Sequence, residues 1–176
     1  MTRVCFDTAS NYFHDFRDGY LNSPEQAREQ FRGKSFRFRA ATAFVHETGQ
    51  SFDFENHEGL FAFLVKADEI ITFNGRTCDL IVLESLIGED SAKSLWQKPH
   101  HDLKGWRGQS LENSVSQFPD LKRSYSLLRE TRYEELSFIK DDFIRRELAG
   151  TYRDAKCTLE LFRLYLGHGK SEFTFR

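Results

Sequence analysis

The strongest constraint on the fold of this chain is a run in which apolar and polar residues alternate. Over residues 34–47, every second position from 36 to 44 is apolar except for a threonine, and Arg37 and Arg39 lie between the first of them; the five residues are Phe36, Phe38, Ala40, Thr42 and Phe44. A period of two indicates a strand with one buried face. Residues 46–50 have the composition of a turn and residues 51–54 can return as a second strand, so we expect an antiparallel β-hairpin.

Short strands and helices alternate through the rest of the chain. Residues 4–6 are β-prone, residues 69–73 form a nearly continuous apolar run typical of a strand buried on both faces, and residues 101–103 can form another strand. Helices are expected from Ser23, from Asn56 to about residue 67, over residues 77–86, from Ser110 to Pro119, and over residues 121–166 with a break at Gly150. The pattern predicts an α/β fold in which helices flank a mixed sheet of about five strands, an antiparallel hairpin plus parallel strands.

Composition favours one folded domain over residues 1–176. The chain is 39% hydrophobic and 30% charged, which excludes collagen-like, low-complexity and disordered classes. No apolar run approaches the roughly 18 residues of a membrane span, and the N-terminus lacks the apolar stretch of a signal peptide, so we expect a soluble protein. The three cysteines form no disulfide or zinc pattern, which favours a cytoplasmic location. The net charge of −2 neither indicates nor excludes a nucleic-acid partner.

Three aspartates stand out because each lies within three residues of a cysteine. They are Asp7 after the first strand, Asp79 after the apolar run, and Asp154 at the start of the predicted last helix. Cysteine favours burial, and a carboxylate at the rim of a core is costly unless it is paired or holds a metal ion. Taken singly, each acid has a simpler explanation. Asp7 can cap a neighbouring helix, Asp79 can cap a helix or pair with an arginine, and Asp154 can favour a helix N-terminus through the helix dipole.

The segment after the apolar run carries the most specific motif in the sequence. It reads F-N-x-x-x-x-D-x-x-x-L from Phe73 to Leu83, with Asn74 and Asp79 at the two polar positions. In this it resembles the DEDD 3′→5′ exonucleases of the ribonuclease H-like superfamily.

Weaker motifs before and after this segment extend the resemblance over most of the chain. The family's D-x-E in the first strand corresponds to residues 7–9, which read Asp-Thr-Ala here, and residues 101–103 resemble a strand found between the family's motifs. The family's last helix carries an acid with a threonine four residues later, as at Asp154 and Thr158. The order of these motifs is that of the family.

The resemblance implies a ribonuclease H-like fold and hydrolysis of phosphodiester bonds in DNA or RNA. The substrate would be a single-stranded or frayed 3′ end, and the cofactor two Mg²⁺ or Mn²⁺ ions. Asp7 would bridge both ions, and Asp79 and Asp154 would each complete one side. Carboxylates suit such hard cations, which activate water and stabilise the leaving oxygen. The resemblance also implies substrate contacts at Thr8, Phe73 and Asn74.

Ala9 departs from the family's pattern because it stands where D-x-E has glutamate. Side chains at positions i and i+2 of a strand share a face, so a glutamate there would lie beside Asp7 and help to hold an ion. As written, the chain should bind the ions poorly and cut slowly or not at all. Two explanations remain open. Ala9 can be an inactivating substitution made in an exonuclease, or the chain can be a decayed nuclease that serves as a non-catalytic nucleic-acid-binding or protein-interaction module.

A second departure concerns the general base. The family carries histidine or tyrosine four or five residues before the third acid, where this chain has Gly150 and Ala149. Tyr152 lies two residues before that acid, which on a helix is about 200° around the axis, so the base remains unassigned. The basic residues Arg153 and Lys156 lie in the same segment. A solvated helix face is the simplest interpretation, and phosphate contact is the alternative if nucleic acid binds.

Overall fold

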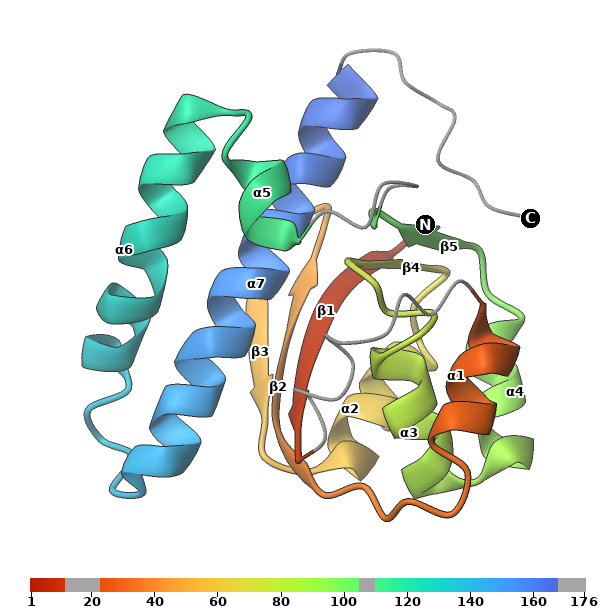
Figure 1. The fold of residues 1–176 in the computed structure, drawn as a ribbon. Helices are drawn as coiled ribbons and strands as arrows, with labels where there is room; N and C mark the ends of the chain where they lie inside the picture. The colour runs from red at the N-terminus through yellow and green to blue at the C-terminus, as the bar shows by residue number, and fades with distance from the viewer. Residues whose placement is uncertain (12–22, 105–109, 168–176) are drawn as a thin grey trace.

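Five strands form one open, mixed sheet in the order β3-β2-β1-β4-β5 (Figure 1). The computed structural model of the chain describes residues 1–11, 23–104 and 110–167. The β1–β2 and β2–β3 pairs are antiparallel, and the β1–β4 and β4–β5 pairs are parallel. The strands are Arg3–Ser10 (β1), Phe38–Val45 (β2), Ser51–Phe54 (β3), Glu69–Thr72 (β4) and His100–Asp102 (β5). The predicted α/β fold is therefore confirmed, including the hairpin and the parallel strands.

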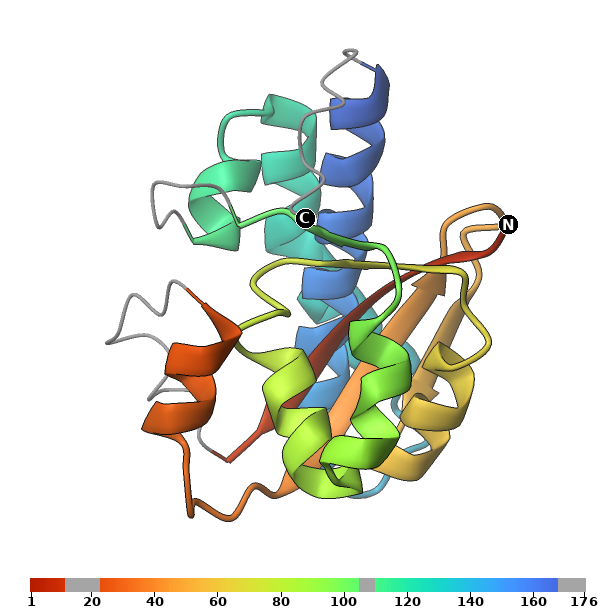
Figure 2. The same ribbon diagram turned by 90° about the vertical axis from the view of Figure 1, so that its right-hand side faces the viewer.

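Helices cover both faces of this sheet. In Figures 1 and 2, α7 crosses one face with α6 beside it, while α2, α3 and α4 lie against the other. The helices are Pro24–Gln30 (α1), His57–Leu64 (α2), Asp79–Ile87 (α3), Glu89–Trp96 (α4), Leu111–Val115 (α5), Pro119–Glu135 (α6) and Asp142–Gly167 (α7). Within the described ranges, none of them has both the length and the apolar composition needed to cross a bilayer.

The central strand β1 divides its side chains between two hydrophobic cores. Val4 and Phe6 pack with the buried leucines of α2 and α3, whereas Cys5 packs with residues of β4 and α7. Alternate side chains of a strand point to opposite faces of the sheet. Asp7 therefore lies on the α7 face with Cys5, and Thr8 lies on the α3 face with Phe6.

Three of the predicted helix starts are capped by the residues that the sequence indicated. The Ser23 hydroxyl accepts a hydrogen bond from the Gln26 backbone N–H, and the Asn56 side chain accepts one from Gly59 at 2.8 Å. Ser110 caps α5 in the same way. Each cap satisfies a backbone N–H that has no partner inside its helix.

The predicted break at Gly150 is wrong, because α7 runs without interruption from Asp142 to Gly167. A glycine inside a helix costs little when the residues around it pack well, and both Ala149 and Thr151 are buried. The break in the helical segment comes earlier, between the end of α6 and Asp142. Asp154 consequently lies in the middle of a long helix and not in its first turn.

Other boundaries also differ from the prediction. β1 extends to Ser10, so Asp7 lies inside the strand and does not follow it. The helix predicted over residues 77–86 begins at Asp79, which is the first residue of α3. The helix α4 was not predicted, because Ala92 and Leu95 are its only buried residues and the rest of its surface is polar. Pro119 begins α6 as well as ending the segment before it.

Candidate metal site

Asp79 connects the first turn of α3 to the central strand. Its side chain is only 3% exposed, and its Oδ1 accepts hydrogen bonds from the Thr8 backbone N–H at 2.9 Å and from the Thr8 hydroxyl at 2.5 Å. Burial raises the pKa of Asp79 to about 7, although the two bonds from Thr8 lower it and the charge of Asp102 adds to the rise. The partner of Asp79 is therefore a threonine and not an arginine. Thr8 is itself buried, and its role as a substrate contact stays a prediction.

Asp154 lies halfway along α7, on the opposite side of the sheet from α3. Its side chain is 22% exposed, and its Oδ1 accepts a hydrogen bond from Arg153 Nε at 2.7 Å. The helix dipole acts within the first and last turns of a helix. The helix dipole therefore does not explain an acid at this position, and the expectation that Asp154 favours a helix N-terminus is wrong.

Asp7, in β1, is affected by the charges of both of these acids. Burial raises its pKa well above the usual value, and the negative charges of Asp79 and Asp154 raise it further, while Arg153 lowers it. Such mutual effects require charges in close proximity. The structure thus brings three acids that are far apart in the sequence into one electrostatic neighbourhood. Their role as metal ligands stays a prediction.

Carboxylate oxygens are the donors that Mg²⁺ and Mn²⁺ prefer, so the chemistry of these three residues fits the ions that the resemblance implies. Their arrangement is not a preassembled cage. In the described part of the chain, no three or more histidine, cysteine, aspartate or glutamate side chains are placed so that they could hold an ion together. One oxygen of Asp79 is bonded to Thr8, and one oxygen of Asp154 is bonded to Arg153.

The position of Ala9 agrees with the reasoning from D-x-E. Ala9 is in β1, two residues after Asp7 and opposite Ala40 of β2. A longer side chain there would start on the face that carries Asp7. The residue is buried.

Gly150 and Tyr152, both on α7, are the residues near the position where the general base is expected. A Cβ built on Gly150 would meet nothing within 4 Å, so this position has room for a side chain. Tyr152 packs its ring 5.1 Å from that of Phe44, and the Arg132 guanidinium lies 4.7 Å over it. Tyr152 is thus part of the packing between β2, α6 and α7.

The turn between β4 and α3, which contains Phe73 and Asn74, is held in an unusual conformation. Asn74 has a positive φ of 70°, and a Cβ on Gly75 would lie 2.3 Å from Thr72 Oγ1, so only glycine fits there. Thr72 Oγ1 accepts a hydrogen bond from the Gly75 N–H at 3.1 Å and pairs with His100 Nε2 at 2.7 Å. Burial lowers the pKa of His100 to about 3, so its ring is neutral at pH 7.

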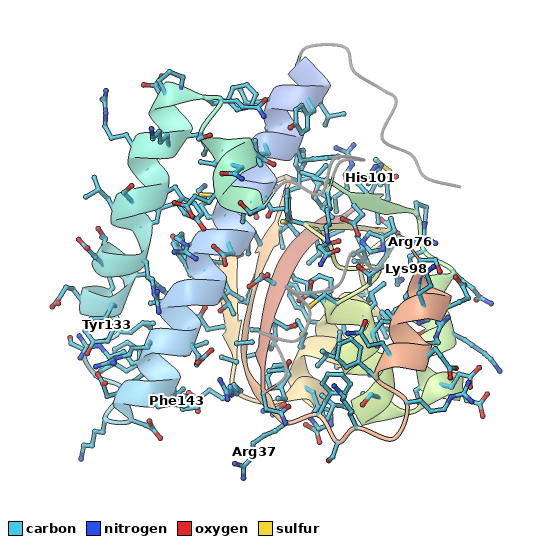
Figure 3. The ribbon with its side chains drawn as sticks, in the orientation of Figure 1. Arg37, Arg76, Lys98, His101, Tyr133 and Phe143 are labelled. Carbon is cyan, nitrogen blue, oxygen red and sulfur yellow. The ribbon has the colours of Figure 1, made fainter. Side chains whose placement is uncertain are left out.

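Asp102 fixes this turn from the end of β5. Its carboxylate accepts hydrogen bonds from three backbone N–H groups, those of Asn74 at 2.6 Å, Arg76 at 3.0 Å and Lys104 at 3.2 Å. Burial raises the pKa of Asp102, and these three donors lower it. In Figure 3, Arg76 and His101 lie on the β5 side of the molecule. The signal in the sequence was an acid at the end of a strand parallel to β4, since such ends meet at one edge of a sheet.

Cys5 fixes β1 relative to α7. Its thiol donates a hydrogen bond to the backbone carbonyl of Ala155 at 3.2 Å, and both residues are fully buried. Burial raises the pKa of this thiol, and the charges of Asp7 and Asp79 add to the rise, so it keeps its proton and remains a donor. The contact lies two residues from Asp7 on one element and one residue from Asp154 on the other.

Comparison with known proteins reveals one informative likeness. The fold is similar to that of the family B DNA polymerase from the hyperthermophilic archaeon Pyrobaculum calidifontis, with a TM-score of 0.51 and 16% sequence identity. The alignment covers 94% of this chain and 24% of the polymerase chain, so this protein spans about a quarter of that enzyme's length. At this identity the likeness concerns the fold alone. No protein-family model and no curated protein matches the sequence.

Proposed function

We propose that this chain is a metal-dependent 3′→5′ exonuclease domain that acts on DNA or RNA and is impaired by Ala9. The observation that carries the proposal is the electrostatic coupling of Asp7 with Asp79 and Asp154 across three elements of the fold. The likeness to a polymerase, an enzyme that by its name acts on DNA, agrees with a nucleic-acid substrate.

The roles of the acids follow from their positions. Asp7 of β1 would serve both ions, while Asp79 of α3 and Asp154 of α7 would each serve one. Bound Mg²⁺ or Mn²⁺ would activate a water molecule and stabilise the leaving oxygen. In the structure, Oδ1 of Asp79 accepts from Thr8, and Oδ1 of Asp154 accepts from Arg153. The chain's own part in catalysis is to supply these oxygens on rigid elements.

Substrate binding falls to the turn before α3. Phe73 and Asn74 lie on the segment that Asp102 and Gly75 hold in place, directly before the helix that carries Asp79. A nucleotide placed against this turn would lie next to the carboxylates. A single-stranded or frayed 3′ end suits such a site, because a terminal nucleotide must leave its duplex partner to reach buried acids.

Restoring the missing acid tests this function. The Ala9→Glu variant should degrade 3′-labelled and 5′-labelled oligonucleotides from the 3′ end when Mn²⁺ or Mg²⁺ is present, and chelation should stop it. The matched control is Ala9→Gln, which has nearly the same size but cannot supply a carboxylate. If Ala9→Glu degrades neither DNA nor RNA with either ion, the proposal is wrong.

The second candidate is a non-catalytic nucleic-acid-binding or protein-interaction module on the same fold. Two observations favour it: Ala9 lacks a donor atom, and Arg153 already engages Asp154. Such a module should bind single-stranded oligonucleotides or a protein partner equally well with and without divalent ions. Its melting temperature should not respond to Mn²⁺, whereas binding of an ion to the folded state would raise it.

A further inference from the structure

The carboxylate of Asp102 joins the turn before α3 to the residue that follows Leu103 after β5. Its Oδ1 accepts hydrogen bonds from two backbone N–H groups, those of Asn74 at 2.6 Å and Lys104 at 3.2 Å. Two donors that share one acceptor oxygen lie within about 6 Å of each other. Asp102 therefore fixes the backbone of Lys104 next to that of Asn74, although the two residues are far apart in sequence.

The side chain of Lys104 is a partly buried cation without an acidic partner. Both oxygens of Asp102 already accept hydrogen bonds from backbone N–H groups. Among the described residues, no carboxylate oxygen lies within 4.0 Å of the Lys104 ammonium. A lysine that loses water on folding normally gains a partner of opposite charge. The three donors of this ammonium are therefore available to a ligand.

Asn74 adds a neutral donor on the same turn. Its Oδ1 accepts a hydrogen bond from the Thr77 hydroxyl at 2.6 Å, which fixes the orientation of the amide. Within residues 1–11, 23–104 and 110–167, its Nδ2 has no acceptor. An amide NH₂ and an ammonium are both donors, so what they can bind together is an acceptor, and the positive charge of Lys104 favours an anion.

The helix that follows the turn has the same preference. No side chain caps the N-terminus of α3, because its N-cap residue Cys78 makes no such hydrogen bond. The N-terminal end of a helix carries a partial positive charge and favours anions. Asp79 lies in this first turn, but its Oδ1 accepts from Thr8 on β1.

We propose that Lys104 and the amide of Asn74 bind a phosphate group in the backbone of single-stranded DNA or RNA. This inference rests on the proposed function, which places the terminal nucleotide against the same turn. Phosphate contacts position a strand without reading its sequence. Lys104 thus holds the strand, and Asp102 is a positioning residue that keeps Lys104 and Asn74 together.

Binding of labelled single strands tests this inference without any assay of cleavage. Fluorescence anisotropy is measured with the unaltered chain in a chelator, so that no divalent ion joins phosphate to protein. Lys104→Gln should weaken binding about tenfold, and equally for strands of different sequence, because one charge-assisted contact is lost. The slope of log affinity against log salt should become shallower by about 0.7, the value for one phosphate contact on a single strand.

A second variant tests the amide independently. Asn74→Asp keeps an oxygen for the Thr77 hydroxyl, and aspartate tolerates a positive φ. It replaces the NH₂ group by a carboxylate oxygen that repels phosphate, so binding should weaken by at least about tenfold. This variant also covers the case in which Lys104→Gln does not fold.

Two controls accompany these variants. Lys104→Arg keeps the charge and should retain both the affinity and the salt slope. Lys66→Gln removes an exposed lysine that follows α2 and should change neither quantity. Thermal melting verifies that each variant is folded.

The outcomes separate this inference from the function on which it rests. If Lys104→Gln leaves the affinity unchanged, or weakens binding without changing the salt slope, Lys104 does not contact phosphate and the inference is wrong. It is also wrong if the unaltered chain binds no strand. In each case the degradation assay with Ala9→Glu still decides the proposed function. If both variants weaken binding as expected and Ala9→Glu degrades nothing, the phosphate site stands and the exonuclease function fails.

Discussion

The Asp79 side and the Asp154 side of the candidate site are held by different means. Asp79 accepts two hydrogen bonds from Thr8. The turn before it is fixed by the hydrogen bonds that Asp102 accepts and by the close packing of Gly75 on Thr72. The Asp154 carboxylate is held by one ion pair with the adjacent Arg153. The departures from the family's pattern also lie on the Asp154 side of the sheet. The first region is thus fixed by several hydrogen bonds, and the second by a single ion pair.

The Asp79→Asn substitution should produce the largest change in the free energy of unfolding among the substitutions on the Asp79 side of the site. Because burial raises the pKa of Asp79 to about 7 from 3.8, the folded state binds more protons than the unfolded state between these values. The stability of the metal-free protein should therefore fall as the pH rises from 4 to 7, by up to about 4 kcal/mol for a shift of this size. The variant keeps an oxygen to accept the bonds from Thr8 but carries no charge.

Urea denaturation at pH 5 and pH 8 measures this effect. Asp79→Asn should be more stable than the unaltered chain at pH 8, and the two should converge at low pH. Glu55→Gln, which removes an exposed acid, is the control and should change stability little at either pH. Equal stability of the unaltered chain and Asp79→Asn at pH 8 would contradict the burial of a charged carboxylate.

The Gly75→Ala substitution should break the turn that supports Asp79. The new Cβ would lie 2.3 Å from Thr72 Oγ1 and 2.5 Å from Thr72 Cβ, so the backbone must move. We expect a loss of about 3 kcal/mol in the free energy of unfolding, at the upper end for overpacked sites. A shift in the midpoint of urea denaturation measures it, and a loss below 1 kcal/mol would mean that the turn is more adaptable than its contacts indicate.

The Asp102→Ala substitution removes the acceptor for three backbone N–H groups. We expect a loss of about 2 kcal/mol, because buried donors without partners carry a desolvation cost. Hydrogen exchange should quicken at Asn74 and Arg76 and remain unchanged at the β1–β2 pairing. Asp102→Asn retains one acceptor oxygen and should lose less stability. Unchanged exchange at both residues would show that Asp102 does not hold the turn.

The Gly150→Ala substitution on α7 should have the smallest effect and the opposite sign to that at Gly75. Gly150 is inside a helix with nothing within 4 Å of a built Cβ, so alanine meets no obstacle. Replacing glycine by alanine inside a helix gains roughly 0.5–1 kcal/mol. A rise in melting temperature would sharpen the contrast between the two sides, and a fall would contradict it.

Local patterns predicted the parts of the fold that depend on neighbours in sequence. The alternation that ends at Phe44 gave the hairpin, and Ser23, Asn56 and Ser110 marked helix starts through their side-chain caps. The continuity of α7 through Gly150 escaped prediction, because it depends on how the helix packs against the sheet. The intrinsic helix propensity of a glycine is the same whether or not the residues around it are buried.

The same limit applies to the candidate site. The motif with Asp79 was recognisable because its residues are close in sequence, and Asp7 and Asp154 were found by order and spacing. The roles of Asp102 and Arg153 were not, since each acts on segments that meet only in the folded chain. Asp102 accepts a hydrogen bond from a turn residue 26 positions away in sequence, and Arg153 of α7 acts on Asp7 of β1. Contacts between residues so far apart produce no periodic pattern in the sequence.

The hydrogen bond from Cys5 to Ala155 sets the phase of α7 against the central strand. Rotating the helix by one residue would carry Asp154 about 100° around its axis and away from Asp7. An insertion or deletion in the first half of α7 would therefore have to be compensated before Ala155 to keep the two acids facing each other. The buried thiol of Cys5 thus fixes the relative position of two segments that are 150 residues apart in sequence.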